Sequence, residues 1–333
     1  MEKVVIALDA MGGDYAPEQT VKGAVEAVNS SDEIHVILVG KQDMIAKELE
    51  KYEYAKEDIE VVHASEFIDM GDVPTVAIKD KKDSSLVVAM KLVREGKADA
   101  LVSAGSTGAV LVGGQLVVGR LKGIKRPPLA PFIPTTKGFS LLIDCGANVD
   151  ARPEHLVQFA QMGSIYYENV MGKKNPTVAL LNIGTEEEKG NQLVKDTKPL
   201  MKECKNINYI GSVEARELVS GAADVIVCEA FVGNVVLKFF EGLALTLFGS
   251  LKEGLMSSTR TKLGALLVKP ALKGLKNQFD TSSQGGAPLL GLKGLVVKAH
   301  GNSSSKEIEI ALKQCISFKK QKINEKIKES ICD

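Results

Sequence analysis

Hydrophobic residues along this chain fall in short unbroken runs that alternate with longer amphipathic stretches. Because the runs lack polar alternation, they predict strands whose two faces are both covered by helices. The strands are expected at 4–8, 35–39, 59–63, 100–103, 141–145, 177–182, 207–211, 225–228 and 295–298. Helices are expected between them, at 17–30, 42–52, 83–96, 107–121, 153–171, 188–203 and 213–221. This alternation predicts an α/β protein with three α/β/α layers and a mostly parallel sheet.

No low-complexity linker and no internal repeat interrupts the chain, so we expect a single α/β domain over residues 1–333. One segment, a helical excursion over 239–280, breaks the alternation. Its first part repeats apolar residues every three or four positions, which predicts one helical stripe. The stripe consists of Phe240, Leu243, Leu247, Leu251 and Leu255. Pro270 is expected to mark a break or a new first turn in its second part.

The excursion is also strongly basic between residues 252 and 276. Glu253 is the single acidic residue there, against the basic residues Lys252, Arg260, Lys262, Lys269, Lys273 and Lys276. Leu263, Leu266 and Leu267 supply the apolar side. Three interpretations stay open: a helix pair packed on the domain or at a dimer interface, a membrane-surface helix, and a binding surface for an acidic protein partner.

The turn after the run at 100–103 reads Ser103-Ala-Gly-Ser-Thr-Gly-Ala109. A small-residue turn between a buried strand and a helix leaves backbone N–H groups free, and the helix dipole there favours an anion such as phosphate. Gly105 and Gly108 allow a close approach, and hydroxyls come from Ser103, Ser106 and Thr107. The alternative is a tight turn in which Ser or Thr only caps the helix. The turn has neither the lysine of a P-loop nor GxGxxG spacing.

Other predicted strands are also followed by turns rich in Gly, Asn, Asp and Ser. These turns span 9–14, 144–148, 182–190, 229–234 and 300–303. Ligands of α/β sheets collect beyond the carboxyl ends of the strands. We therefore expect these turns to line one polar crevice together with the 103–109 turn.

Three features near these turns are candidates for chemistry. Lys189 follows three glutamates, and it is either part of a solvated first helical turn or an ammonium aimed at a phosphate or an oxyanion. His300 precedes Gly301 at a strand end and is either structural or catalytic. The loop at 285–291 begins with Gly285 and Gly286, and it either closes over a phosphate or only turns the chain.

Composition narrows the class of protein without favouring a partner. Of 333 residues, 44% are hydrophobic and 25% charged, as in globular proteins, and basic and acidic residues balance at 42 each. The five cysteines form no CxxC or Cys/His cluster, which indicates reduced thiols and no metal site. The N-terminal apolar run is too short for a signal peptide, and no stretch approaches ~20 uncharged apolar residues. We expect an intracellular protein that does not cross a membrane.

Taken together, the chain resembles the bacterial phosphate acyltransferase family (PlsX), the acyl-[acyl carrier protein]:phosphate acyltransferases. The resemblance covers almost the whole chain in order. It rests on DAMGGD at 9–14, SAGSTGA at 103–109, DCGAN at 144–148, LLNIGTE at 180–186 with Lys189-Gly190, GNVVLK at 233–238, Glu241-Gly242, GGAPLLG at 285–291 and His300-Gly301. Tyr15 stands where the family is expected to have His, and Ser106 where it is expected to have Asn.

The resemblance implies transfer of a long acyl chain from acyl carrier protein to inorganic phosphate, which gives acyl phosphate for phospholipid synthesis. It also implies a fold similar to the isocitrate/isopropylmalate dehydrogenases, no cofactor, a homodimer, and a cytoplasmic enzyme held peripherally at the membrane. The implied partners are acyl carrier protein, the membrane surface and a downstream acyltransferase that uses acyl phosphate; no nucleic acid is expected.

Because phosphate is already a nucleophile, the enzyme must hold it against the thioester carbonyl and stabilise the oxyanion. We expect Lys189, Asn234 and His300 to act in catalysis. Substrate or phosphate is expected at Asp9, Gly12, Gly13, Asp14, Ser103, Gly105, Ser106, Thr107, Gly108, Asn148, Glu186, Gly285 and Gly286. We expect the membrane or the carrier protein to contact Lys262, Lys269, Leu263, Leu266 and Leu267.

Three rival functions stay open. A phosphate acetyltransferase-like enzyme that uses acyl-coenzyme A is closest in mechanism. A non-catalytic membrane-associated binding protein belongs to another class. A metal-dependent dehydrogenase would need clustered aspartates, whereas the 215–260 region carries only Asp224. Cys145 and Cys228 lie at strand ends, where either could serve as a nucleophile if it were activated.

Overall fold

The computed structural model describes residues 3–279 and 285–332. These residues cluster into two compact units, whereas the sequence pattern led us to expect one domain. The first unit comprises Met1–Pro131, Gln161–Asn175 and Ser282–Asp333, and the second comprises Phe132–Ala160 and Pro176–Thr281. The chain passes between them more than once, so a composition shift or a linker could not have marked the boundary.

The first unit is built on a six-stranded sheet within the described residues, in the order β10-β11-β4-β1-β2-β3. Neighbouring strands are parallel except for β10, which is antiparallel to β11. The strands are β1 (Val4–Asp9), β2 (Ile34–Gly40), β3 (Ile59–His63), β4 (Ala100–Ser103), β10 (Ala287–Leu289) and β11 (Leu295–Lys298). β1 and β4 are almost wholly buried, as their unbroken apolar runs require.

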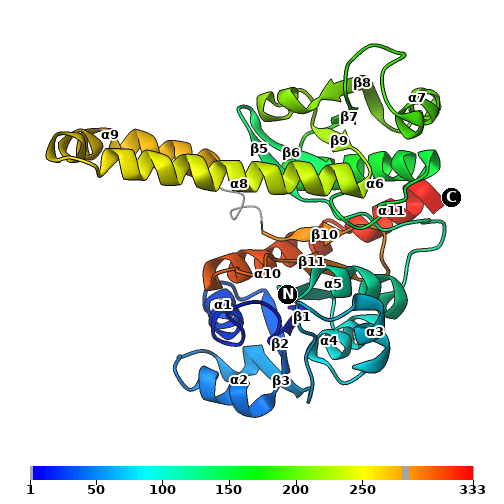
Figure 1. The fold of residues 1–333 in the computed structure, drawn as a ribbon. Coiled ribbons are helices and arrows are strands. Elements are labelled where there is room, and N and C mark those ends of the chain that lie inside the picture. Colours follow the sequence, from blue (N-terminus) through cyan, green and yellow to red (C-terminus); the bar gives the residue numbers. More distant parts are fainter. Residues whose placement is uncertain (1–2, 280–284, 333) are drawn as a thin grey trace. The chain divides into compact units, whose positions relative to one another are not determined.

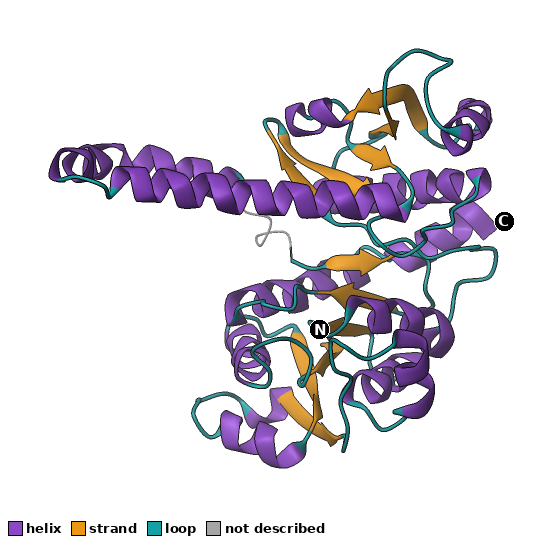
Figure 2. Ribbon diagram, in the orientation of Figure 1, coloured by secondary structure: helices purple, strands orange, loops and turns teal. Residues whose placement is uncertain are grey.

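Helices cover both faces of this sheet (Figure 2). α1 and α10 pack against each other and on β1, and α4 and α5 pack together, with α4 against β1 and β4. The helices of the unit are α1 (Glu18–Asn29), α2 (Gln42–Leu49), α3 (Pro74–Asp80), α4 (Ser85–Arg94), α5 (Thr107–Gly113), α10 (Ser305–Lys320) and α11 (Ile323–Cys332), with short turns η1 (Lys56–Asp58) and η2 (Gly114–Val118). The predicted three-layer α/β/α arrangement with a mostly parallel sheet is confirmed.

In the described part of the second unit, the strands form a separate five-stranded sheet, in the order β5-β6-β9-β7-β8. It is parallel except for the β5–β6 pair. The elements are β5 (Phe132–Thr135), β6 (Gly138–Ile143), β7 (Thr177–Asn182), β8 (Asn208–Glu214), β9 (Val225–Val227), α7 (Gln192–Glu203) and η3 (Ala215–Ser220). α6 (Pro153–Met171) begins in this unit and ends in the first. The strands therefore form two sheets, not the one sheet that we expected.

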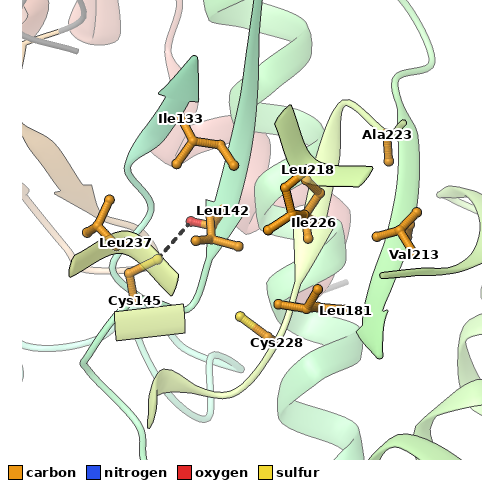
Figure 3. Close-up of a cluster of buried hydrophobic side chains, with 11 residues drawn as sticks. Ile133, Leu142, Cys145, Leu181, Val213, Leu218, Ala223, Ile226, Cys228 and Leu237 are labelled. Atoms are coloured by element: carbon orange, nitrogen blue, oxygen red, sulfur yellow. Dashed lines mark hydrogen bonds between the residues drawn. The ribbon is translucent and has the colours of Figure 1, made fainter. Parts of the chain in front are cut away.

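A cluster of buried side chains holds the second unit together (Figure 3). Leu142 of β6 and Ile226 of β9 are completely buried, and Leu237 of α8 reaches the same cluster. Burial of such aliphatic side chains stabilises the folded state by about 1.5–3 kcal/mol each. The cluster fixes the strand ends from which the turns of this unit emerge.

The expected excursion is a hairpin of two long helices, α8 (Ala230–Leu255) and α9 (Thr259–Gln278), and residue 280 lies outside the described residues (Figure 1). The rings of Phe240 and Phe279 lie 6.4 Å apart, so the two helices run back alongside each other. α9 continues through Pro270, which corrects the expected break. Proline removes one backbone hydrogen bond, and this exposed helix tolerates that loss.

Most of the hairpin is exposed. In α8 only Ala230, Gly233 and Leu237 are buried. Leu243, Leu247 and Leu251 of the predicted stripe, and Leu263, Leu266 and Leu267 of α9, are exposed instead. Packing on the body of the chain therefore does not account for this apolar surface.

Among the described residues, α8 is the one helix long and apolar enough to cross a membrane by length and composition. Lys238 and Glu241 interrupt the apolar residues of α8, so no uncharged apolar stretch of ~20 residues stands out in the sequence. Length and composition alone are weak support for a membrane span.

Element boundaries differ from expectation where a cap or a tight turn decides them. The helix expected from 188 begins at Gln192, because the Asn191 side chain accepts a hydrogen bond from the Val194 amide and caps α7. The helix expected over 107–121 is α5 followed by the π-helical turn η2. The segment at 213–221 is the end of β8 and the 3-10 turn η3 rather than a helix.

Candidate functional site

A buried carboxylate joins the ends of β1 and β4 in the first unit. Asp9, the last residue of β1, accepts hydrogen bonds from Ser85 Oγ at Oδ1 (2.6 Å) and from Ser103 Oγ at Oδ2 (2.7 Å). Burial raises the pKa of the Asp9 carboxyl, although these hydrogen bonds and the charge of Lys298 act in the opposite direction. Both oxygens are engaged, so Asp9 orients the two serines.

Two glycines bring the turns after β1 and β4 into contact. A Cβ at Gly12 would lie 2.5 Å from Asp9 Oδ2 and 2.8 Å from the Gly105 nitrogen, so only glycine fits there. The Asp14 amide donates to the Gly301 carbonyl (2.7 Å). The turns at 9–14, 103–109 and 300–301 therefore lie together.

Their position in the sheet is also where ligands collect. The chain leaves β1 for its neighbour β2 on one side, while β4 pairs with β1 on the other side. Such a change in direction is the topological switch point of an α/β sheet, and ligands bind beyond the carboxyl ends of its strands. Asp9 and Ser103 end the two strands that flank it.

Helix capping and helix packing explain two residues of the 103–109 turn without a ligand. Ser106 is the N-cap of α5, its Oγ accepting from the Ala109 amide at 3.5 Å, as in the alternative interpretation of the turn. A Cβ at Gly108 would lie 2.6 Å from Pro74 Cγ, so Gly108 serves the packing of α3 on α5. Thr107 is exposed.

Sequence reasoning missed a buried lysine beside this turn. Lys298, in β11, pairs with Ser103 of β4 in the sheet, and its charge acts on Asp9. Its ammonium donates to the Ala299 carbonyl. A lysine at the end of an otherwise apolar strand run was the signal available in the sequence. His300, two residues later, is exposed.

The glycines at 285 and 286 are clamped from α10. Gln314 accepts from the Gly286 amide at Oε1 (3.0 Å) and donates from Nε2 to the Gly286 carbonyl (3.1 Å). A Cβ at Gly286 would lie 2.6 Å from Val297 Cγ1. Packing explains both glycines, and their part in phosphate binding stays a prediction.

In the second unit another buried aspartate organises the turn after β6. Asp144 accepts from the Ala147 amide (3.1 Å), from the Asn148 amide (2.8 Å) and from Asn148 Nδ2 (2.7 Å). A Cβ at Gly233 would lie 1.9 Å from the Asp144 carbonyl oxygen, so glycine lets α8 lie directly against this turn. Asn234 follows it, exposed, with Oδ1 3.8 Å from the Cβ position of Gly146.

The loop after β7 carries the predicted catalytic lysine. The Lys189 ammonium lies 3.5 Å from Glu186 Oε1, and both side chains are about half exposed. A hydrogen bond from its own backbone amide and the charge of Lys189 lower the pKa of Glu186. Asn182, at the end of β7, donates to the carbonyls of Gly184 (2.9 Å) and Lys189 (3.1 Å) and so closes the loop.

A second lysine, Lys198 of α7, supports this loop through hydrogen bonds to its backbone. Sequence reasoning did not single it out. Lys198 of α7 is only 3% exposed. Its ammonium donates to the carbonyls of Glu186 (3.0 Å), Glu187 (2.8 Å) and Lys189 (3.0 Å). Lys198 lies on the buried face of α7 with Thr197 and Met201. The helical spacing of these residues was the signal available in the sequence.

The two strand-end cysteines are poor nucleophiles. Cys145 and Cys228 are buried, and burial raises the pKa of both thiols well above the ordinary value. A thiol held neutral does not attack a thioester. In the part of the chain that the structure describes, no three His, Cys, Asp or Glu side chains gather where they could hold a metal ion.

The structure thus brings the expected site residues together as two groups. The first unit gathers the turns at 9–14, 103–109 and 300–301, and the second holds those at 144–148, 182–190 and 229–234. The single crevice that we expected joins residues of both units and stays a prediction. Of the two departures from the family pattern, Tyr15 is 57% exposed and Ser106 keeps its oxygen as a cap.

Comparison with known proteins gives consistent matches over nearly the whole chain. A family model described as "Fatty acid synthesis protein" matches residues 4–326. A phosphate acyltransferase of Alkaliphilus oremlandii is 55% identical and covers 98% of this chain and 97% of its own. One from Clostridium acetobutylicum is 50% identical and covers 97% and 98%.

Solved structures agree at the level of the fold. A phosphotransacetylase from Streptococcus pyogenes superposes with a TM-score of 0.66 at 17% identity, over 95% of this chain and 94% of its own. Because the family model spans residues 4–326 and these relatives are about half identical over nearly the whole chain, the chain belongs to the phosphate acyltransferase family.

Proposed function

We propose that this enzyme transfers a long-chain acyl group from acyl carrier protein to inorganic phosphate, and that the acyl phosphate feeds phospholipid synthesis. A phosphate oxygen attacks the thioester carbonyl, the C–S bond breaks, and the phosphate proton goes to the departing thiolate. The products are acyl phosphate and the free carrier thiol. No cofactor enters this balance.

One observation carries the proposal: the glycine-lined turns after β1 and β4 meet at the switch point of their sheet, held by Asp9. Backbone N–H groups of such turns suit an anion. The buried cation Lys298 next to Ser103 adds positive charge there. Holding phosphate and thioester in reacting geometry supplies about 7–11 kcal/mol, so no covalent intermediate is needed.

The expected polar residues divide into two roles under this proposal. Lys189, Asn234 and His300 are exposed side chains and are proposed to face the reacting groups. The turns at 10–14 and 103–109 are proposed to hold phosphate. The Ser103 hydroxyl donates to Asp9 (2.7 Å) and the Gly105 amide to Ser103 Oγ (3.1 Å), so these two residues are proposed to shape the phosphate site rather than to donate to the anion. Asp9 is proposed to position Ser85 and Ser103, because its two carboxylate oxygens accept hydrogen bonds from their hydroxyls.

A single assay separates this function from its rivals. Purified protein is given acyl carrier protein thioester, acetyl-coenzyme A, or no donor, and phosphate-dependent thiol release is measured. Release from the carrier thioester supports the proposal. Release from acetyl-coenzyme A alone supports the phosphate acetyltransferase, and no release from either supports a non-catalytic binding protein.

Replacement of Lys189 by alanine tests the proposed role of its ammonium. Loss of a group that stabilises the developing oxyanion is expected to lower kcat by about 10²-fold. Acyl phosphate formation is the measurement, and Lys195→Ala on the exposed side of α7 is the control. A rate within a few-fold of wild type would remove Lys189 from the mechanism.

We also propose that the enzyme is cytoplasmic and homodimeric and that it meets its partners through the α8–α9 hairpin. The exposed leucines Leu263, Leu266 and Leu267 and the exposed cations Lys262 and Lys269 support an apolar contact with an acidic partner. An anionic lipid surface and an acidic carrier protein share that chemistry. The downstream acyltransferase is then expected at the same membrane surface.

A further inference from the structure

The second unit contains a cavity of about 460 Å³ at the carboxyl ends of β7 and β9. Leu181 and Val227 come from the strands, Leu193 and Val194 from α7, and Val232 and Val236 from α8. All residues that line the cavity belong to this one unit. Its size lies within the range of small-molecule sites, which is about 300–1,000 Å³.

The polar side chains in the wall of this cavity already form hydrogen bonds with backbone groups of the chain. Glu229 accepts from the Phe231 (2.6 Å) and Val232 (2.9 Å) amides as the N-cap of α8. Asn191 caps α7, and the Asn182 amide closes the 183–190 loop. Apart from Gly190 and the Cys228 thiol, the remaining wall is aliphatic, so the cavity favours a hydrocarbon over a polar ligand.

The Cys228 thiol in the same wall supports this conclusion. It lies 3.6 Å from the Asp144 carbonyl oxygen, and burial raises its pKa. The thiol is therefore neutral and adds no charge to the wall. Figure 3 shows Cys228 and Leu181 among the buried side chains of the unit.

One end of the cavity adjoins the loop that carries Lys189. Ile183 and Gly190, which begin and end that loop, both line the cavity. The Ile183 side chain is 77% exposed, so this end is open to solvent. A hydrocarbon chain in the cavity would have its functional end beside Glu186 and Lys189.

We propose that this cavity holds the hydrocarbon chain of the thioester and that its walls select chain length. The inference rests on the proposed function, because it takes the carbonyl at the Lys189 loop to be the reacting group. Each methylene that leaves water is expected to strengthen binding by about fourfold until the cavity is full.

The test narrows the cavity and measures binding and turnover separately. Leu193→Trp places a larger ring in the wall from α7, and Leu200→Trp, on the exposed side of the same helix, is the control. Binding is measured by calorimetry with butanoate and hexadecanoate. Turnover is measured as kcat/KM with C4, C8 and C16 thioesters on acyl carrier protein.

For Leu193→Trp we expect the C16 to C4 ratio of kcat/KM to fall by at least about tenfold, with hexadecanoate binding weakened to match. The control is expected to keep the wild-type profile. An unchanged ratio and unchanged hexadecanoate binding would overturn the proposal. If Leu193→Trp does not fold, as judged by circular dichroism, Val236→Phe narrows the cavity from α8 instead.

The two readouts distinguish this proposal from the function on which it rests. If wild type releases thiol from no thioester, yet binds hexadecanoate in a way that Leu193→Trp weakens, the proposed function fails and the cavity assignment stands. If wild type turns over carrier thioesters with a profile that neither cavity variant alters, the function stands and the cavity assignment fails.

Discussion

Buried charges decide the local geometry of both groups of turns. Asp9 and Asp144 each accept several hydrogen bonds from the residues around them, and Lys198 donates to three carbonyls. Burial of a charge is costly unless it is paired or hydrogen-bonded, so these contacts are strongly specified. Lys189 and Asn234, which are proposed to meet substrate, are by contrast exposed side chains on these turns.

Lys198→Met is expected to release the 183–190 loop without changing the buried volume greatly. The three carbonyls lose their common donor, which should lower the free energy of unfolding by about 1–3 kcal/mol. Because Lys198 acts through Lys189, kcat is expected to fall while KM for phosphate changes little. Chemical denaturation and steady-state kinetics measure the two effects.

Lys195→Met, on the exposed side of α7, is the matched control, and Lys198→Arg is expected to restore part of kcat because it keeps the charge. The assignment of Lys198 as a positioning residue would be wrong if Lys198→Met lost stability but kept wild-type kcat.

At the scale of elements, the helices of the first unit are tied together by a second buried carboxylate. Glu309 of α10 is 4% exposed and accepts from Ser30 Oγ (2.9 Å), Lys313 (2.8 Å) and Lys306 (2.6 Å). Ser30 follows α1, so this contact spans the α1–α10 interface. A capping box begins α10, because the Ser304 amide donates to Glu307 Oε2 at 2.7 Å.

The Glu309 contact predicts a pH dependence of stability. Burial alone would raise the pKa of Glu309, but hydrogen bonds from Lys306, Lys313 and Ser30 outweigh it and lower the pKa from 4.5 to about 2. Since the folded pKa lies below the unfolded one, the stabilisation is complete above about pH 4.5 and is lost as pH falls towards 2. Glu309→Gln should remove roughly 2 kcal/mol at pH 7.

Urea denaturation between pH 7 and pH 3 measures this effect, with Glu325→Gln on α11 as an exposed control. The variant is expected to show a shallower loss of stability in acid than wild type. Parallel curves for wild type and Glu309→Gln would contradict the assigned role.

The α8–α9 hairpin exposes leucine side chains along both helices, and the contribution of its positive charge can be tested directly. Reversal of Lys262 and Lys269 to glutamate should weaken binding to anionic vesicles by at least about tenfold at low salt, since each lysine near such a surface contributes about 1 kcal/mol. Vesicle co-sedimentation measures the loss. Binding of the same variant to acyl carrier protein is measured in parallel.

Reversal of the exposed lysines Lys47 and Lys205 changes net charge equally and serves as control. If the Lys262/Lys269 variant binds both vesicles and carrier protein as wild type does, neither is the partner of this surface. The exposed leucines would then be assigned to an interface between two copies of the chain. Sedimentation velocity would then show whether wild type is dimeric.

At the scale of the whole molecule, local patterns predicted the kinds of element but not their division into units. Apolar runs placed β1, β4, β7 and β11 closely, because a strand buried on both faces needs an unbroken run. The short strands β5 and β10 and the helix α3 were missed. β5 and β10 are antiparallel edge strands of three or four residues, too short to leave a periodic signal.

The sequence by itself determined the α/β class, the strand-end turns, the leucine-rich helical excursion and the family, since each depends on neighbouring residues or on order along the chain. Only the tertiary structure decided that two sheets form, that Asp9 binds Ser85 and Ser103, and that Lys198 supports the Lys189 loop. Asp9 and Ser85 are 76 positions apart, and no local periodicity encodes such a contact. The physical reason is that hydrophobic patterning acts over one turn or one strand, whereas a buried charge must be satisfied by whatever the complete fold brings beside it.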